Sequence, residues 1–218
     1  DGGIGALREM GLTIVNNSPN RNYITDIKGI NTELLQQKFK EIHITILCDV
    51  DNPICGPEGA AAVFAPQKGA SPEQIIMLDN QLCLWSDLLK QNTGKDITQL
   101  KHGGAAGGIT AAMYALLNAQ LISGSEYCLT LSRFHDNLLQ AGVVITGEGK
   151  IDLQSFYGKI PGTVANLCQK HNVPVYAVVG LAEKQVLTRF DKVFIMSQYT
   201  RSIQDSIKNA PHYLKIIS

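Results

Sequence analysis

Polar side chains and glycines are concentrated in a few short segments of this sequence, and one of them reads ITGEGKID at residues 145–152. Gly147 and Gly149 let backbone N–H groups come close to an anion, while Glu148 and Asp152 could hold Mg²⁺ or accept a proton. An apolar stretch, Val143–Thr146, precedes these residues and is predicted to be a short strand. Open α/β sheets bind ligands where such a strand ends in a glycine-rich turn.

A lysine near the start of a predicted helix follows a few residues later. Lys159 precedes the helix expected over Thr163–His171, and a lysine beside a helix N-terminus suits a phosphate group. The alternative interpretation is a tight strand-to-helix turn whose charges are simply solvated. We favour a phosphate site because this feature and the glycine-rich segment stand close together in the sequence.

Two carboxylates and an amide follow the strand predicted over Ile42–Cys48. Asp49, Asp51 and Asn52 could bind a metal or orient a substrate hydroxyl group. An Asx turn leading into Pro53 accounts for the same residues without any ligand. The spacing alone leaves both interpretations open.

The long loop Asp49–Ala70 also carries Lys68, and a second glycine-rich segment, Gly103–Gly108, precedes a helix predicted over Ile109–Ala119. A lone loop lysine is usually only solvent-exposed. The glycines could cradle an anion or allow close helix packing, and the sequence does not decide between the two. Phosphoryl transfer needs positive charge, N–H donors and carboxylates together, so the co-occurrence of these segments is more informative than any one of them.

The elements that must position these residues fall into two parts. From about residue 125 strands and helices alternate regularly, which predicts an α/β fold with a parallel, doubly wound sheet. The earlier residues are less regular and include a turn-rich loop over Asn16–Arg21. We therefore expect a domain boundary near residues 123–125.

The composition is that of an ordinary globular protein, with 44% hydrophobic and 17% charged residues in a chain of 218. Its 19 basic and 19 acidic residues cancel, so no bulk field attracts nucleic acid or anionic lipid. No apolar run reaches the ~20 residues of a membrane helix, and no leader pattern is visible. Because Asp1 lies inside a glycine-rich turn and is not Met, we expect a segment to precede it.

The five cysteines are an odd number, widely spaced and without a CxxC pair. This pattern predicts neither a disulfide framework nor a zinc site. We expect free thiols in a reducing compartment, and a cytoplasmic protein.

Taken together, these segments resemble the signature of type-1 glycerate kinases. The likeness covers nearly the whole chain in the same order. It rests on DGG at residues 1–3, CDVDNP at 48–53, VFAPQKGA at 63–70, GAAGG at 104–108, VITGEGKIDLQS at 144–155 and YGKIP at 157–161.

The resemblance implies a two-domain α/β kinase that uses ATP and Mg²⁺ to phosphorylate D-glycerate to 2-phosphoglycerate. Residues 1–124 would form a second α/β domain, inserted into a Rossmann-like parallel-sheet domain of which residues 125–218 are the C-terminal part. The substrate would lie in the cleft between the domains. ATP and a small-molecule substrate are the expected partners, with no nucleic acid and no membrane, and a homodimer is left open.

The matching positions give the expected site residues. Lys68 and Lys159 would neutralise phosphate charge, and Asp49 or Asp152 would act as a base or a metal ligand. The full expected set is Asp49, Asp152 and Lys68 for catalysis; Asn52, Gln67, Gly107 and Gly108 for substrate; Gly147, Glu148, Gly149 and Lys159 for ATP and phosphate; and Asp152 and Glu148 for the metal.

The sequence departs from the family pattern in lacking the N-terminal Asp-Ser-Phe-Lys-Gly-Ser-like motif. Two alternatives therefore stand beside the first interpretation. One is a glycerate-binding fragment that is catalytically incomplete. The other is a kinase that forms 3-phosphoglycerate or acts on a related small hydroxy acid.

Overall fold

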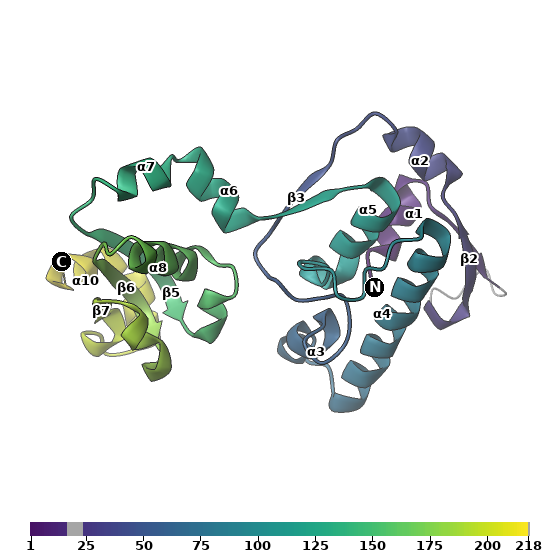
Figure 1. The fold of residues 1–218 in the computed structure, drawn as a ribbon. Coiled ribbons are helices and arrows are strands. Elements are labelled where there is room, and N and C mark those ends of the chain that lie inside the picture. Colours follow the sequence, from purple (N-terminus) through teal and green to yellow (C-terminus); the bar gives the residue numbers. More distant parts are fainter. Residues whose placement is uncertain (17–23, 218) are drawn as a thin grey trace. The chain divides into compact units, whose positions relative to one another are not determined.

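The chain forms two compact units, residues 1–123 and 124–218, each with its own hydrophobic core. A computed structural model describes residues 1–16 and 24–217 and shows an α/β protein with parallel strand pairs (Figure 1). Apart from Asn16, the loop predicted over Asn16–Arg21 lies outside the described residues. Among the helices that the structure describes, none has the length and apolar character that a membrane crossing requires.

The first unit is built around two long helical segments and two strand pairs. The strands β1 and β2 are antiparallel, and β3 and β4 are parallel. In order, the elements are α1 (Ile4–Met10), β1 (Thr13–Asn16), η1 (Ile24–Asp26), β2 (Ile27–Asn31), α2 (Glu33–Phe39), β3 (Thr45–Cys48), α3 (Ala60–Phe64), η2 (Pro66–Lys68), α4 (Pro72–Thr93), η3 (Ala105–Gly108), α5 (Ile109–Leu117) and β4 (Gln120–Ser123).

Local sequence signals fix the ends of α4, the longest helix. The Ser71 hydroxyl accepts a hydrogen bond from the Gln74 amide at 3.3 Å, and the Gln74 side chain accepts one from the Ser71 amide at 2.8 Å. This reciprocal pair satisfies two amides at the helix start, and Pro72 fits the first turn. At the other end Gly94 adopts a left-handed conformation with φ 73°.

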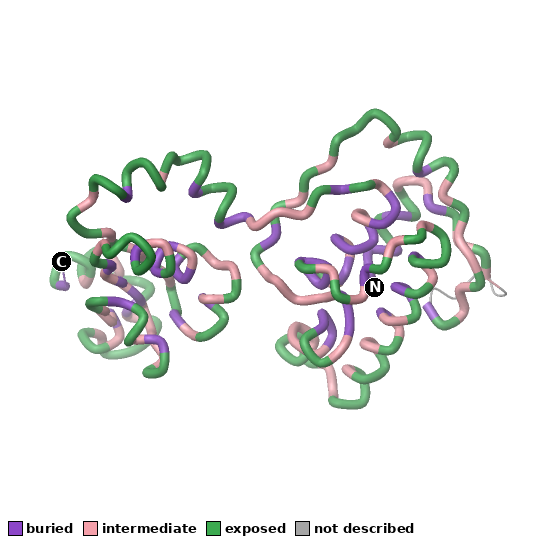
Figure 2. The backbone as a smooth tube through the Cα atoms, in the orientation of Figure 1, coloured by how far each residue is buried: buried purple, intermediate pink, exposed green. Residues whose placement is uncertain are grey.

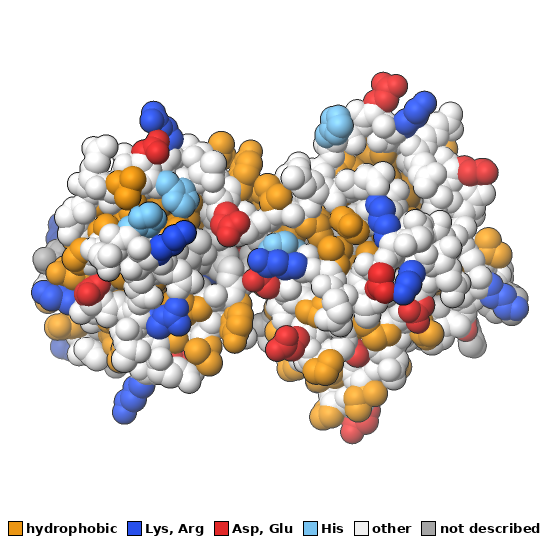
Figure 3. All heavy atoms as spheres, viewed as in Figure 1, with side chains coloured by type: hydrophobic (Ala, Val, Ile, Leu, Met, Phe, Trp, Pro, Cys, Tyr) orange, Lys and Arg blue, Asp and Glu red, His pale blue; other side chains and the backbone are white. Residues whose placement is uncertain are grey.

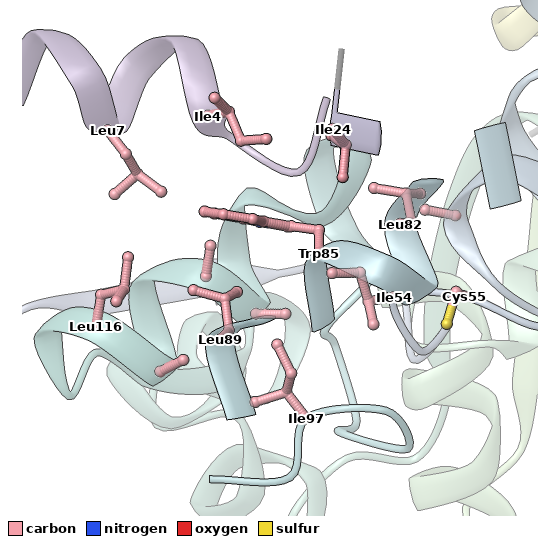
Figure 4. Packing of buried hydrophobic residues seen from close by; sticks show 14 of the residues in the cluster. Ile4, Leu7, Ile24, Ile54, Cys55, Leu82, Trp85, Leu89, Ile97 and Leu116 are labelled. Atoms are coloured by element: carbon pink, nitrogen blue, oxygen red, sulfur yellow. The ribbon is translucent and has the colours of Figure 1, made fainter. Parts of the chain in front are cut away.

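The core of the first unit is organised around Trp85 of α4, which is completely buried. Figure 4 shows its ring among Ile4, Leu82 and Leu89. Its indole N–H donates to the Gly2 carbonyl at 3.1 Å, so the largest side chain of the core also satisfies its polar atom. Buried positions recur along α4 and α5 in Figure 2, where the two helices pack on each other.

The second unit has a three-stranded parallel sheet in the order β5-β6-β7, as the strand and helix alternation predicts. The crossover helix α8 packs on β5 and β6 and covers the buried side chains of Val175, Ala177 and Val179. The elements are α6 (Gly124–Leu131), α7 (Phe134–Leu138), β5 (Val144–Ile151), η4 (Leu153–Phe156), α8 (Ile160–Lys170), β6 (Val175–Ala182), η5 (Lys184–Arg189), β7 (Lys192–Ile195), η6 (Met196–Gln198), α9 (Ile203–Lys208) and α10 (Ala210–Ile217).

The predicted strand end at Thr146 is wrong, because β5 continues to Ile151. Its pairing with β6 runs from Val144 opposite Val175 to Ile151 opposite Ala182. Gly147 and Gly149 are therefore strand residues and do not form a turn. A Cβ at Gly147 would lie 2.9 Å from a carbonyl oxygen of β6, so the absent side chain is what lets the strands pair through this stretch.

The expectation that all cysteines are free thiols is also wrong. Cys55, in the loop after β3, and Cys83, in α4, form a disulfide that spans 28 residues. The spacing rule missed it because this is one bridge between distant segments, which only the fold brings together. Cys48, Cys128 and Cys168 are free.

Replacing Cys83 with serine should lower the free energy of unfolding under oxidising conditions. The bridge restricts the unfolded chain, and a loop of this length predicts a loss of about 3.5 kcal/mol. Denaturant unfolding of both proteins measures it. With dithiothreitol the difference should shrink strongly, and Cys128→Ser, at an exposed free cysteine, should behave like the wild type. Equal stability of Cys83→Ser and wild type without reductant would rule the bridge out.

Candidate active site

Asp49 lies at the carboxyl end of β3, directly after the last strand residue, and its side chain is exposed. Asn52, three residues further on, is held in place by two hydrogen bonds. The Asn52 side chain donates to the Glu58 carbonyl at 2.8 Å, and the Asn52 carbonyl accepts from the Gly104 amide at 2.8 Å. The Asp49–Asn52 segment and the second glycine-rich segment are thus neighbours, which places two of the predicted segments together.

Lys68 and Gly107 line one pocket of about 150 Å³ in the first unit, together with Asp1 and the apolar residues of α3 and α4. Lys68 and Gln67 belong to the short helical turn η2, and both side chains are exposed. Three of the predicted segments therefore meet here: the start of the chain, the loop after β3 and the glycine-rich segment.

The second glycine-rich segment packs closely at one glycine and lines a pocket at another. Ala106, Gly107 and Gly108 all have left-handed backbones, with φ of 48°, 75° and 94°. Gly108 is buried, and a Cβ there would press on Ile54 and Gly2, so its role is close packing. Gly107 has nothing within 4 Å of its Cβ position and lines the pocket.

In the second unit, Glu148, Ser155 and Lys159 form one hydrogen-bonded group. Glu148 projects from β5, and its two oxygens accept from the Ser155 hydroxyl at 2.8 Å and the Lys159 ammonium at 3.4 Å. Lys159 is the residue before the first turn of α8, where backbone N–H groups are free to meet an anion. Lys159 precedes a helix as predicted, although the helix begins at Ile160 and not at Thr163.

Beside this group, Lys150 bridges two carboxylates. Its ammonium lies 3.2 Å from Asp152 and 3.0 Å from Glu183. The hydrogen bond to Glu183, and then the one to Asp152, raise the pKa of Lys150. The same contact with Lys150 lowers the pKa of Glu183, so Lys150 and Glu183 are both charged at neutral pH.

The residues present fit a metal only in part. Among the described residues, no three His, Cys, Asp or Glu side chains gather into a group that could hold an ion. Both oxygens of Glu148 already have partners, whereas Asp152 Oδ1 is buried and accepts no hydrogen bond within the described chain. Mg²⁺ often takes one or two protein carboxylates and completes its shell with phosphate oxygens and water. Asp152 suits such an arrangement better than Glu148 does.

Sequence reasoning missed three residues that complete these groups: Ser155, Glu183 and His102. Ser155 is fully buried, and Glu183 reaches Lys150 from beyond the end of β6. Asp51 and His102 lie 3.3 Å apart, although 51 positions separate them in the chain. Of these residues, only His102 carried a local sequence signal, because it directly precedes the second glycine-rich segment.

Charged side chains are dispersed over the face of each unit seen in Figure 3, with acidic groups among the basic ones. This agrees with the formal net charge of zero. The candidate groups are thus small and local, and no broad surface of one sign accompanies them in this view.

The fold and these groups define an α/β protein with polar side chains and a helix N-terminus at the carboxyl ends of parallel strands. This is where proteins of this architecture bind their ligands. The chain belongs to the glycerate kinase family, whose sequence profile it matches over residues 1–218.

Curated relatives support the family assignment. The chain is similar to a glycerate kinase of Halalkalibacterium halodurans, with 37% identity over 185 residues, which cover 83% of this chain and 49% of the relative. A glycerate 2-kinase of Escherichia coli K12 is 36% identical over 185 residues, with the same coverage. A glycerate kinase of Bacillus subtilis is 30% identical over 224 residues, 99% of this chain and 59% of the relative. The chain spans about half the length of the curated relatives it matches.

A solved structure agrees as well. The crystal structure of a protein described as a glycerate kinase 2 from Salmonella typhimurium LT2 aligns with a TM-score of 0.65 and 34% identity. The alignment covers 99% of this chain and 61% of that chain.

Ser155→Ala should destabilise the second unit. The variant removes a buried hydroxyl that donates to the Glu148 carboxylate, and a hydrogen bond to a charged group contributes about 2 kcal/mol. Denaturant unfolding measures the loss. Gln154→Ala, at the exposed neighbouring position, is the matched control and should change stability little. If both variants unfold at the wild-type midpoint, the Ser155–Glu148 hydrogen bond does not contribute to stability.

The Cys48 thiol should report the charge of Asp49. Burial, and then the negative charge of Asp49, raise the pKa of Cys48, so the thiol stays protonated to higher pH than a free cysteine. Asp49→Asn should lower that pKa, because it removes the repulsion that opposes the thiolate. A pH titration of thiolate ultraviolet absorbance, in a background with Cys128 and Cys168 replaced by serine, measures the shift. An unchanged or higher pKa in Asp49→Asn would contradict the proximity of the two groups.

Proposed function

We propose that this protein is an ATP-dependent glycerate kinase that phosphorylates D-glycerate to 2-phosphoglycerate. The observation that carries the proposal is the group of Glu148, Ser155 and Lys159 at the start of α8, in a chain that matches the glycerate kinase family throughout. A lysine at a helix start is the combination that phosphate groups favour. The name glycerate 2-kinase of the Escherichia coli relative supports 2-phosphoglycerate as the product.

In this proposal Lys159 and Lys68 neutralise the charge of the transferred phosphate. Glu148 holds Lys159 through its carboxylate, which keeps the ammonium at the helix start. Gly147 and Gly149 leave the backbone of β5 open beside it. Positioned charge of this kind supplies most of the catalysis in phosphoryl transfer, since the protein contributes little covalent chemistry.

The acceptor side of the reaction belongs to the first unit. Asp49 is exposed at a strand end and is the proposed base for the glycerate hydroxyl, while Asn52, Gln67, Gly107 and Gly108 are the proposed substrate contacts. Asn52 is already oriented by its bond to Glu58. Since Gly108 is packed against Ile54, we propose that it acts through its backbone position.

The second unit is the proposed site for ATP and Mg²⁺. A cavity of about 770 Å³ lies along β5 and β6, with Gly147, Gly149 and Gly180 on its wall and apolar side chains of α9 and α10 around it. Its size and apolar character suit a nucleoside. When bound, Mg²⁺ would neutralise phosphate charge, with the unpaired Oδ1 of Asp152 as its protein ligand.

The proposed function also implies a cellular compartment and a set of partners. We propose a cytoplasmic enzyme whose partners are glycerate and ATP, and we keep a homodimer as the proposed assembly. The Cys55–Cys83 disulfide is at odds with a reducing compartment, and we expect the pair to be reduced there.

Lys68→Ala and Asp152→Asn should each lower kcat/KM for glycerate by about 100-fold or more, because each removes a group that stabilises charge in the transition state. The assay couples ADP release to a spectrophotometric signal, with D-glycerate and Mg-ATP, in the complete gene product that contains this sequence. The matched controls are Lys38→Ala and Asp136→Asn, at exposed positions of α2 and α7. If kcat/KM stays near wild type in both site variants, the proposed site is wrong.

The same assay separates the alternatives. A glycerate-binding protein without turnover would show glycerate binding by calorimetry and no ADP release. A kinase for another hydroxy acid would turn over tartronate and leave glycerate unchanged. Chemical analysis of the product distinguishes 2-phosphoglycerate from 3-phosphoglycerate.

A further inference from the structure

His102 is a buried side chain on a left-handed backbone, a combination that calls for an explanation. Its φ is 68°, and only 6% of the residue is exposed. A left-handed backbone costs most residues about 1–2 kcal/mol, and burial restricts a polar ring further. Such a residue persists where its surroundings hold it in place.

The His102 ring is held by the segment that carries the proposed acceptor residues. Its Nδ1 lies 2.7 Å from the Val50 carbonyl and 3.3 Å from Asp51 Oδ1. A carbonyl oxygen can only accept, so Nδ1 must carry the proton and donate. Val50 stands directly between Asp49 and Asp51, and its carbonyl orientation fixes the peptide that follows it.

The backbone around His102 adds two further bonds to the same segment. The His102 amide donates to the Asp51 carbonyl at 3.3 Å, and the Gly104 amide donates to the Asn52 carbonyl at 2.8 Å. Lys101 also lies 3.5 Å from Asp51. A Cβ at Gly104 would collide with the Pro53 carbonyl, so the two segments are in direct backbone contact.

Three consecutive carbonyls, those of Val50, Asp51 and Asn52, thus accept hydrogen bonds from residues 102–104. Only the first of the three bonds comes from a side chain. Asp49 directly precedes these three residues and Asn52 is the last of them, so the His102 ring bonds to the segment that carries both proposed acceptor residues.

We propose that His102 is a positioning residue for phosphoryl transfer, which fixes the Asp49–Asn52 segment by donating Nδ1–H to the Val50 carbonyl. This inference rests on the proposed function, because it assigns His102 a role in presenting the acceptor residues. The ring itself needs no contact with substrate. Misplacing a positioned group by about 1 Å can cost about 100-fold in rate, so such a bond is worth testing by kinetics.

Two variants separate the bond from the backbone conformation. Asparagine tolerates a left-handed backbone and carries a side-chain amide donor close to the place of Nδ1, so His102→Asn keeps both features. Glycine accepts the same backbone and has no side-chain donor, so His102→Gly removes the ring together with its bond. Asn172→Gly is the matched control for introducing glycine, since Asn172 is exposed and left-handed with φ 55°.

His102→Gly should lower kcat for glycerate phosphorylation by about 10- to 100-fold, while the KM for ATP stays within about threefold of wild type. His102→Asn should recover kcat to within about threefold of wild type, and Asn172→Gly should change neither constant. Equal losses in His102→Asn and His102→Gly would overturn the proposal, because the donor would then not be what matters. Wild-type kcat in His102→Gly would overturn it too.

Amide hydrogen exchange of residues 49–52 gives a second readout that does not depend on turnover. Exchange should rise in His102→Gly relative to wild type and return in His102→Asn. If the wild type shows no kinase activity, the proposed function fails while this comparison still tests the clamp. Should His102→Gly not fold, His102→Gln replaces it, because its longer side chain cannot place a donor at the Nδ1 position; unchanged exchange in that variant would overturn the inference.

Discussion

The backbone of Gly2 lies directly on the indole ring of Trp85, and the first unit depends on this contact. A Cβ at Gly2 would collide with the ring, and the indole N–H donates to the Gly2 carbonyl. On its other side the Gly2 amide donates to the Gly107 carbonyl at 3.0 Å. One buried side chain therefore joins the start of the chain to the second glycine-rich segment, and this places Gly107 beside Lys68.

Close packing at glycines also shapes the second unit, where it determines how far strand β5 extends. Gly147 and Gly180 keep β5 and β6 close enough for the pairing to continue past the point where a turn was expected, because a Cβ at either position would meet a carbonyl oxygen of the other strand. The longer strand carries Glu148 up to the start of α8, where Ser155 and Lys159 reach both of its oxygens. The charges near this strand end are paired within the protein, which keeps each side chain in a defined place before any ligand binds.

The clamp at His102 shows why loops without secondary structure can still be ordered. The Asp49–Asn52 segment has no strand partner, yet its carbonyls accept bonds from residues 102–104. Backbone groups that would otherwise need water are satisfied by a second loop. The two loops thus hold each other in place through these hydrogen bonds, and Gly104 permits their close approach.

The sequence by itself determined the family, the parallel sheet of the second unit, the capped helix α4 and most of the polar segments. These follow from local motifs and short-range periodicity, which do not need the fold. Only the tertiary structure decided that β5 pairs with β6 as far as Ile151, that Cys55 and Cys83 form a disulfide, and that the His102 ring hydrogen-bonds to the Val50 carbonyl. Each of these contacts joins residues far apart in the chain, and local pattern carries no information about which distant segments will meet.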